Sequence, residues 1–304
     1  MIKKILKWIG FILAGLLGLL ALAAISLYVI TEGKLNQVYD VSPSGLVIPS
    51  DPATIARGEH LVNAMGLCME CHTDNFSGEV FDEGLLVGTF SIANLTSGKG
   101  GVGGQFSDED WVRAIRYGID PEGKTLINMP PFNHFSDGDL VAIIAYLKSL
   151  SPVDHEMPET SLGLLGRYSV LMMPFLLTAQ NIDHTAPRPP APEPGVSVEY
   201  GAYLANICTH CHGPDLAGGT QFGSGVNLTP AGNLSSWTEA DFIKTIRTGT
   251  TPEGNFLNAD LMPWRRFGKM TDDELKAIWL YLQSVPPVEV TPQPAQSWRI
   301  SIGA

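Results

Sequence analysis

The chain has 304 residues, which is enough for two domains of ordinary size, and its apolar fraction of 44% is typical of folded protein. Lys and Arg total 19 against 31 Asp and Glu, so the formal net charge is -12 at pH 7. Such a charge repels nucleic-acid phosphates and excludes nucleic acid as an expected partner, whereas a basic protein partner is compatible with it.

The first predicted element is a membrane-spanning helix. Lysines at positions 3, 4 and 7 precede an uncharged apolar run over residues 8–30, which is longer than the roughly 20 residues that span a bilayer as a helix. The lysines place the start of the chain in the cytoplasm and the rest outside. The sequence Ala21-Leu22-Ala23 resembles a signal-peptidase site. Because the apolar run continues beyond that site, we expect residues 1–31 to be an uncleaved anchor.

The four cysteines form two pairs, and a histidine follows each pair directly. In a CxxCH sequence, the two thiols add to the vinyl groups of one haem and the histidine ligates its iron. The sequence therefore predicts two covalently bound haem c groups and leaves no cysteine for a disulfide. The predicted attachment and iron-binding residues are Cys68, Cys71 and His72 in the first motif, and Cys208, Cys211 and His212 in the second.

Two other sites use CxxC pairs. A zinc site would need both pairs, or Cys with His, to converge in one domain, but the pairs at 68 and 208 each lie inside their own copy of a repeat. A thioredoxin-like redox site would need a βαβ context, which neither pair has.

The sequence after the anchor contains two copies of one pattern. Residues 111–132 correspond to residues 242–267, and the Asn-Leu-Thr sequence at 94–96 recurs at 227–229. Each copy predicts a middle helix and a terminal helix, and each of these begins with a capping box or a similar sequence. The capping pairs are Ser107 with Asp110, Ser136 with Asp139, Thr238 with Asp241, and Thr271 with Glu274.

A shorter helix is expected before each CxxCH sequence. It contains Gly58 in the first copy and Gly201 in the second. The missing side chain would let Tyr146 or Tyr281 of the terminal helix pack closely against it.

This order of elements resembles the class I cytochrome c fold in both halves, and the whole resembles the dihaem cytochrome c family, which includes cytochrome subunits of membrane-bound dehydrogenases. The resemblance implies an all-α fold with two tandem cytochrome c domains behind one N-terminal transmembrane helix. The expected divisions are an anchor at 1–31, domain 1 at 51–152, an apolar segment with a Pro-rich linker at 153–194, domain 2 at 195–290 and a tail at 291–304.

The resemblance also implies that a methionine from the loop before each terminal helix completes the iron coordination. Met129 and Met262 occupy that position, and a proline follows each. His134 is a competing ligand, but the second copy has no histidine there. Thioether ligation raises the reduction potential of both haems. Two interpretations stay open for four further residues. They contact the haem propionates or the methionine loop, or they only connect loops to one another. These residues are Asn94, Asn227, Arg116 and Arg247.

The apolar segment at 161–178 lies between the two predicted domains. As a second span it would leave the second CxxCH in the cytoplasm and would bury Arg167 in the bilayer at a cost. We expect a helix that lies on the membrane surface or packs against the domains or an integral partner, with simple core as the alternative. The Pro-rich stretch at 185–195 is a semi-rigid connector.

These features predict an electron-transfer protein on the periplasmic face of a bacterial cytoplasmic membrane, with no catalytic residues of its own. Its expected partner is a redox protein or a membrane dehydrogenase or oxidase complex, and a small-molecule substrate is not expected, because both irons have two axial ligands. The alternatives are a dihaem enzyme, either a peroxidase or a thiosulfate-oxidising cytochrome, and a subunit that tethers a soluble dehydrogenase.

Overall fold

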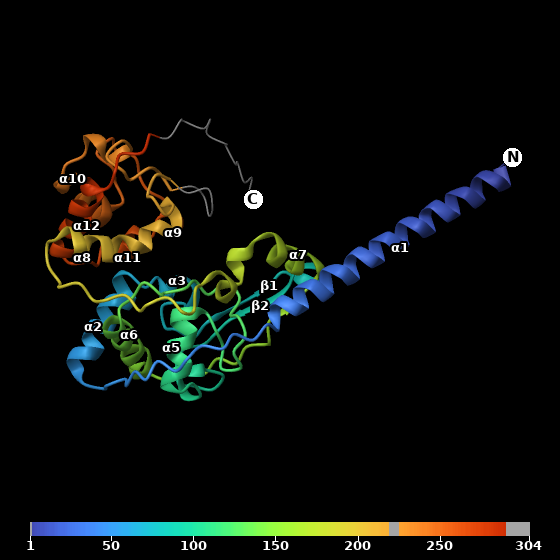
Figure 1. The fold of residues 1–304 in the computed structure, drawn as a ribbon, viewed down its shortest axis with the longest axis horizontal. Coiled ribbons are helices and arrows are strands. Elements are labelled where there is room, and N and C mark those ends of the chain that lie inside the picture. The colour runs from blue at the N-terminus through green and yellow to red at the C-terminus, as the bar shows by residue number, and fades with distance from the viewer. Residues whose placement is uncertain (1, 219–224, 290–304) are drawn as a thin grey trace. The chain divides into compact units, whose positions relative to one another are not determined.

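The computed structural model describes residues 2–218 and 225–289, and the chain divides into two compact units, Met1–Ala191 and Pro192–Ala304 (Figure 1). Both units are mostly helical, and each contains one copy of the repeated sequence pattern.

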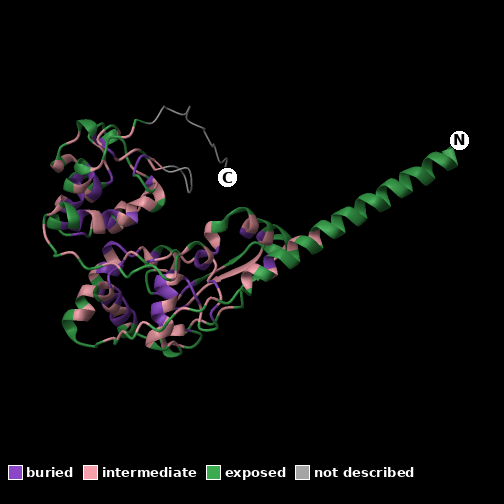
Figure 2. Cartoon of the chain, viewed as in Figure 1, coloured by how far each residue is buried: buried purple, intermediate pink, exposed green. Residues whose placement is uncertain are grey.

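Helix α1, Ile2–Leu35, is one uninterrupted helix. Its apolar side chains are exposed along its length (Figure 2), and Thr31 is its only buried residue. The Thr31 hydroxyl donates a hydrogen bond of 2.8 Å to the carbonyl of Leu27. Within the described residues, α1 is the one helix whose length and composition would allow it to cross a membrane. None of the described residues buries the most apolar stretch of α1, as expected for an anchor or a signal sequence.

The first unit is built around a pair of packed helices, α2 (Pro52–Ala64) and α6 (Asp137–Ser149). The remaining helices of this unit are α3 (Cys68–His72), α4 (Gly84–Val87), α5 (Asp108–Tyr117), α7 (Leu164–Met172), and the 3-10 helices η1 (Val102–Gly104), η2 (Pro174–Leu176) and η3 (Thr178–Asn181). Side chains from α2, α5 and α6 form its core, among them the fully buried Leu61, Trp111 and Ile144.

A small antiparallel sheet in the first unit departs from the predicted all-α class. Strands β1 (Glu79–Asp82) and β2 (Gly88–Ile92) pair with Phe81 opposite Phe90, and β3 (Ser161–Leu162) pairs with the other edge of β2. The strands contain the β-branched and aromatic residues that favour extended backbone. Strands β1 and β2 form in the long loop after the first CxxCH sequence, where the pattern of the repeat predicted only a loop, and β3 comes from beyond the terminal helix.

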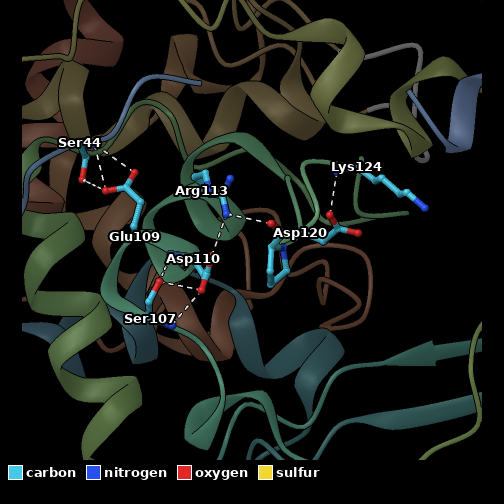
Figure 3. A network of polar contacts seen from close by, with 8 residues as sticks. Ser44, Ser107, Glu109, Asp110, Arg113, Asp120 and Lys124 are labelled. Carbon is cyan, nitrogen blue, oxygen red and sulfur yellow. Dashed lines mark hydrogen bonds and ion pairs between the residues drawn. The ribbon is translucent and has the colours of Figure 1, made fainter. Parts of the chain in front are cut away.

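The connector between α1 and α2 is fastened to the first unit along its length. The amide of Tyr39 donates to the carbonyl of Gly123 at 2.8 Å. Further along, the amide and hydroxyl of Ser44 donate to the carboxylate of Glu109 on α5 at 3.0 and 2.8 Å (Figure 3). Helix α1 is therefore followed by a connector that is hydrogen-bonded to this unit at Tyr39 and Ser44.

The second unit repeats the helix pair with α8 (Val198–Ala205) and α12 (Asp272–Ser284). The remaining helices are η4 (Asn206–Cys208), α9 (Thr209–His212), η5 (Asn233–Ser236), α10 (Glu239–Thr248) and α11 (Trp264–Phe267). Phe242 of α10 packs against Trp279 of α12 with ring centroids 5.7 Å apart. Residues 291–304, the predicted tail, lie outside the described residues.

The predicted close approach at the two glycines is confirmed. A Cβ atom added at Gly58 would lie 1.9 Å from the carbonyl oxygen of Ala142 and 2.9 Å from the Cβ of Tyr146. At Gly201 the same atom would meet the carbonyl of Ala277 at 1.9 Å and the Cβ of Tyr281 at 2.9 Å. Only glycine permits this helix crossing.

Three of the four predicted capping pairs form complete capping boxes, at Ser107, Thr238 and Thr271. The fourth N-cap, Ser136, accepts a hydrogen bond of 3.2 Å from the amide of Asp139. The carboxylate of Asp139 also receives Arg57 of α2 at 3.0 Å. One acidic residue at the start of α6 thus links the two helices of the central pair.

Candidate haem sites

The two CxxCH histidines are held in the same way. His72 Nδ1 lies 2.7 Å from the carbonyl oxygen of Ala93, and His212 Nδ1 lies 2.7 Å from that of Val226. A carbonyl oxygen can only accept, so Nδ1 carries the proton and donates it, and the lone pair is on Nε2. This outer hydrogen bond is how proteins orient an imidazole that binds a metal.

Burial favours the neutral form of these imidazoles. His72 and His212 are 8% and 7% exposed. Desolvation lowers the pKa of both side chains, while the hydrogen bond to the carbonyl acts in the opposite direction. A neutral imidazole has the free lone pair that iron ligation requires.

The cysteines are half-buried free thiols. Burial raises the pKa of Cys68 and of Cys208 to about 12. Over residues 2–218 and 225–289, no cluster of three or more His, Cys, Asp or Glu side chains could hold a metal ion. Two thiols in one short turn before a neutral imidazole suit covalent attachment of haem c.

The carbonyls that hold the histidines belong to the residues just before Asn94 and Asn227. Asn94 is fully buried; its Nδ2 donates to the carbonyl of Val153 at 2.8 Å, and its Oδ1 accepts the amide of Thr96 at 2.9 Å. Asn227 Nδ2 makes the matching 2.8 Å bond to the carbonyl of Val288. These asparagines tie the loop beside the histidine to the chain that follows the terminal helix.

The matched arginines also tie loops in both units. Arg116 Nη1 donates to Asp137 at 2.8 Å and Nη2 donates to the carbonyl of Phe135 at 3.2 Å. Arg247 Nη2 donates to Asp272 at 2.7 Å. Because both aspartates open the terminal helices, each arginine fixes the middle helix to the start of the terminal helix. The observed contacts are those of the loop-tying interpretation.

The loop of Met129 is braced by a segment from beyond the terminal helix. The amide of Asn128 donates to the carbonyl of Leu176 at 2.7 Å, and the hydroxyl of Thr178 donates to the carbonyl of Met129 at 2.5 Å. Asn128 has a φ of 57°, in the left-handed region. Part of the apolar segment at 161–178 therefore supports the first methionine loop, a contact that sequence reasoning missed.

The loop of Met262 is braced from within. The amide of Met262 donates to the carbonyl of Asn258 at 2.9 Å, and the indole Nε1 of Trp264 donates to the carbonyl of Leu257 at 3.0 Å. The indole lies against Gly249, where an added Cβ would be 2.3 Å from the ring. Trp264 thus closes the second methionine loop on itself.

His134, the competing ligand, is packed among aromatic rings. Its ring centroid lies 4.3 Å from that of Phe135 and 6.2 Å from that of Phe132.

Sequence reasoning also missed the two carbonyls that accept from the histidines, at Ala93 and Val226. The repeated Asn-Leu-Thr sequence, which begins one residue later in each copy, is the signal that could have located them.

Family comparisons agree with this arrangement in both units. The family model described as cytochrome C oxidase, cbb3-type, subunit III matches residues 53–147, and the model described as cytochrome c matches residues 198–286. The chain therefore contains two cytochrome c domains, one in each unit. The presence of two such domains supports two haem c groups.

Its relatives include cytochrome subunits of dehydrogenases and a dihaem cytochrome. The chain is 27% identical over 275 residues to the alcohol dehydrogenase (quinone) cytochrome c subunit of Gluconacetobacter polyoxogenes, with 79% of this chain and 57% of that protein covered. It is 25% identical over 271 residues to the fructose dehydrogenase cytochrome subunit of Gluconobacter japonicus, with 77% and 53% covered. It is 27% identical over 281 residues to a diheme cytochrome c-type protein of Cereibacter sphaeroides, with 80% and 92% covered. The chain spans little more than half the length of the two dehydrogenase relatives.

Proposed function

We propose that the chain is a membrane-anchored dihaem c-type cytochrome that passes single electrons between redox partners on the periplasmic face of a bacterial cytoplasmic membrane. The observation that carries this proposal is the repeated arrangement of His72 and His212, each neutral, buried and oriented through Nδ1 by a backbone carbonyl at 2.7 Å. Haem c, when bound, supplies the one-electron iron couple.

In this proposal the protein attaches and orients each haem. Thioether bonds form at Cys68 and Cys71 in the first domain and at Cys208 and Cys211 in the second. His72 and His212 are the proximal ligands of the two irons. The tautomer fixed by the carbonyls directs Nε2 to the iron in each domain.

Met129 and Met262 are the proposed distal ligands. The carbonyl of Met129 accepts a hydrogen bond from Thr178, and the amide of Met262 donates one to the carbonyl of Asn258. These bonds fix the backbone of each methionine. With a histidine and a methionine on each iron, no position would be open to a substrate, which favours electron transfer over chemistry at the iron. Methionine ligation also raises the reduction potential of both haems.

The proposed partner is a membrane-bound dehydrogenase or another respiratory complex, and the chain acts as its cytochrome subunit or as a carrier. The names of the relatives, which include cytochrome subunits of alcohol and fructose dehydrogenases, support this assignment. The long exposed apolar helix α1 supports anchoring in the membrane.

The proposal is tested by a pyridine haemochrome assay combined with optical and low-temperature magnetic spectra of the purified full-length protein. We expect two low-spin haems per chain, both with the weak near-infrared band of methionine-ligated ferric haem. A high-spin haem in either domain would contradict the closed coordination and favour a dihaem peroxidase or a thiosulfate-oxidising cytochrome. A bis-histidine spectrum in domain 1 would identify His134 as the ligand.

A further inference from the structure

An exposed apolar surface lies on the first unit beside the end of α1. It is formed by α4 and α7, which pack against each other, while α7 also packs against α1 (Figure 1). Leu85, at the tip of α4, is 94% exposed. We define the juxtamembrane face by its exposed large side chains, which are Leu85, Leu86 and Val87 of α4 and Leu164, Leu165, Tyr168 and Met172 of α7.

The one charged side chain of α7 is directed at α1 and away from this face. Arg167 Nη2 forms an ion pair of 2.9 Å with Glu32, and Nη1 donates to the hydroxyl of Thr31 at 3.0 Å. Its guanidinium also lies 4.0 Å from the ring centroid of Tyr28. Both the charge and the donors of Arg167 are therefore used by the last turns of α1, and the exposed surface of α7 stays apolar.

These contacts fix the level of α7 relative to the apolar part of α1. Tyr28 lies two residues before the apolar run ends at Ile30, which is about 3 Å along a helix that rises about 1.5 Å per residue. Tyrosine and arginine are typical of the layer between hydrocarbon and water. If α1 spans a bilayer, α7 lies at the depth of the lipid headgroups.

The first unit is held rigidly to α1 at this level. Lys34 Nζ donates to Gln180 Oε1 at 3.0 Å, beyond the end of α7, and Lys124 Nζ donates to Asn36 Oδ1 at 2.9 Å. With the Arg167 contacts, these bonds join three separate segments to the end of α1. The juxtamembrane face is thus held next to α1.

We propose that the juxtamembrane face rests on the lipid bilayer, with α4 and α7 inserted into the headgroup–acyl boundary beside the spanning helix. This inference rests on the proposed anchoring by α1. A lipid surface is the occupant because the face is continuous with the apolar surface of α1 and lies at the level where that helix meets the headgroups. An exposed apolar surface of this kind marks an interaction site.

The insertion is shallow because charged residues flank α4. Asp82 and Glu83 immediately precede it and are exposed. Carboxylates are costly to bury, so they stay at the water side of the headgroups while the leucines after them enter the boundary. The contact would hold the first haem site at a fixed height above the membrane, which favours exchange of electrons with an integral membrane partner.

The test uses the full haem-loaded chain in lipid nanodiscs, with one spin label on an introduced cysteine. The label is placed at Leu85→Cys on the face or, as a control, at Val47→Cys in the connector that leads away from α1 (Figure 1). Val47 is 79% exposed and Leu85 94%, so neither replacement disturbs packing. Power-saturation spectra with oxygen and a water-soluble nickel chelate then report whether each label faces lipid or water.

We expect the Leu85 label to be accessible to oxygen and shielded from nickel, at a depth of about 5–10 Å or less in the boundary, and the Val47 label to show the opposite. Equal nickel access at both positions would overturn the proposal and leave the face to a protein partner. A third label, at Ile12→Cys in α1, tests the membrane anchor separately from the lipid contact of the juxtamembrane face. Loss of shielding at Ile12 would reject the anchor, whereas shielding at Ile12 without shielding at Leu85 rejects only the lipid contact.

Discussion

The two domains hold their histidines alike but support their methionine loops differently. In domain 1, the loop of Met129 is braced by Thr178 and Leu176, from a segment that follows the terminal helix and leads back to α7. In domain 2, the loop of Met262 is braced by Trp264 and Asn258 of the same loop.

Within the described residues, the methionine loop of domain 1 is tied to a segment beyond its terminal helix, whereas that of domain 2 is tied within the same loop. The brace of domain 1 continues through Gln180 to Lys34 at the end of α1, so the loop of Met129 is connected to that helix. Over residues 225–289, the brace of domain 2 is local and uses residues of the same loop. We therefore expect the distal coordination of haem 1, and not that of haem 2, to respond to changes in the segment between the domains.

The largest expected effect comes from removing one attachment motif at a time. Cys68→Ala with Cys71→Ala should lower the intact mass by one haem and prevent domain 1 from folding, because the haem would fill the core between its helices. Cys208→Ala with Cys211→Ala should do the same in domain 2. Intact-mass and haem-specific optical measurements give the result, and loss of both haems from either variant would contradict the independence of the domains.

Replacing the glycine at the helix crossing should lower the stability of the two domains equally, because the geometry of the crossing is the same in both. Gly58→Ala and Gly201→Ala each place a methyl 1.9 Å from a carbonyl oxygen, and overpacking of this kind costs about 1–3 kcal/mol. Gly138→Ala is the matched control on α6, because its added Cβ meets nothing closer than Ser136 Oγ at 4.0 Å. Thermal unfolding followed at each haem band should show a loss for the first two variants and none for the control.

The two braces should act only on their own methionine. Thr178→Val removes the hydroxyl that donates to the Met129 carbonyl, and Trp264→Phe removes the indole donor of the second loop. Each loss should cost about 0.5–1.5 kcal/mol. The near-infrared methionine band, followed during titration with imidazole, should weaken earlier for haem 1 in the first variant and for haem 2 in the second. A simultaneous change at both haems would disprove separate bracing.

The smallest expected effect is electrostatic, and it distinguishes the middle helix of domain 1, α5, from that of domain 2, α10. Arg113 pairs with Asp110 at 2.7 Å, while the corresponding position in domain 2 is Lys244. Burial of Asp110 acts to raise its pKa, but hydrogen bonds from Ser107 and Arg113 outweigh it and lower the pKa below the ordinary value of 3.8. Arg113→Gln should cost about 0.2–1 kcal/mol at pH 7.

The pH dependence of this variant follows from the lowered pKa. Asp110 contributes stability above its unfolded pKa and loses it as the pH falls through the folded value. The deficit of Arg113→Gln should therefore shrink under acid, as measured by unfolding temperature against pH. The control, Lys244→Gln, should show a smaller deficit at neutral pH, and an equal deficit would remove the distinction between the helices.

The sequence predicted much of the candidate sites because their signals are local. The CxxCH spacing places two thiols and an imidazole in one turn, and the capping sequences mark the helix starts. Because the sequence pattern occurs twice, a residue assigned in one copy supports the assignment of the corresponding residue in the other. The glycines at 58 and 201 predicted the helix crossing because no other residue allows such an approach.

Only the tertiary structure decided the features that join residues far apart in the chain. The β1–β2 pairing is extended by β3, which comes from beyond the terminal helix. The brace on Met129 and the contact of Arg167 with α1 join segments that are far apart in the sequence. No periodic pattern in the sequence predicts such contacts. Local chemistry and short spacing determine where haem can be attached, whereas long-range hydrogen bonds and packing determine how the loop of Met129 is held and which surface lies beside α1.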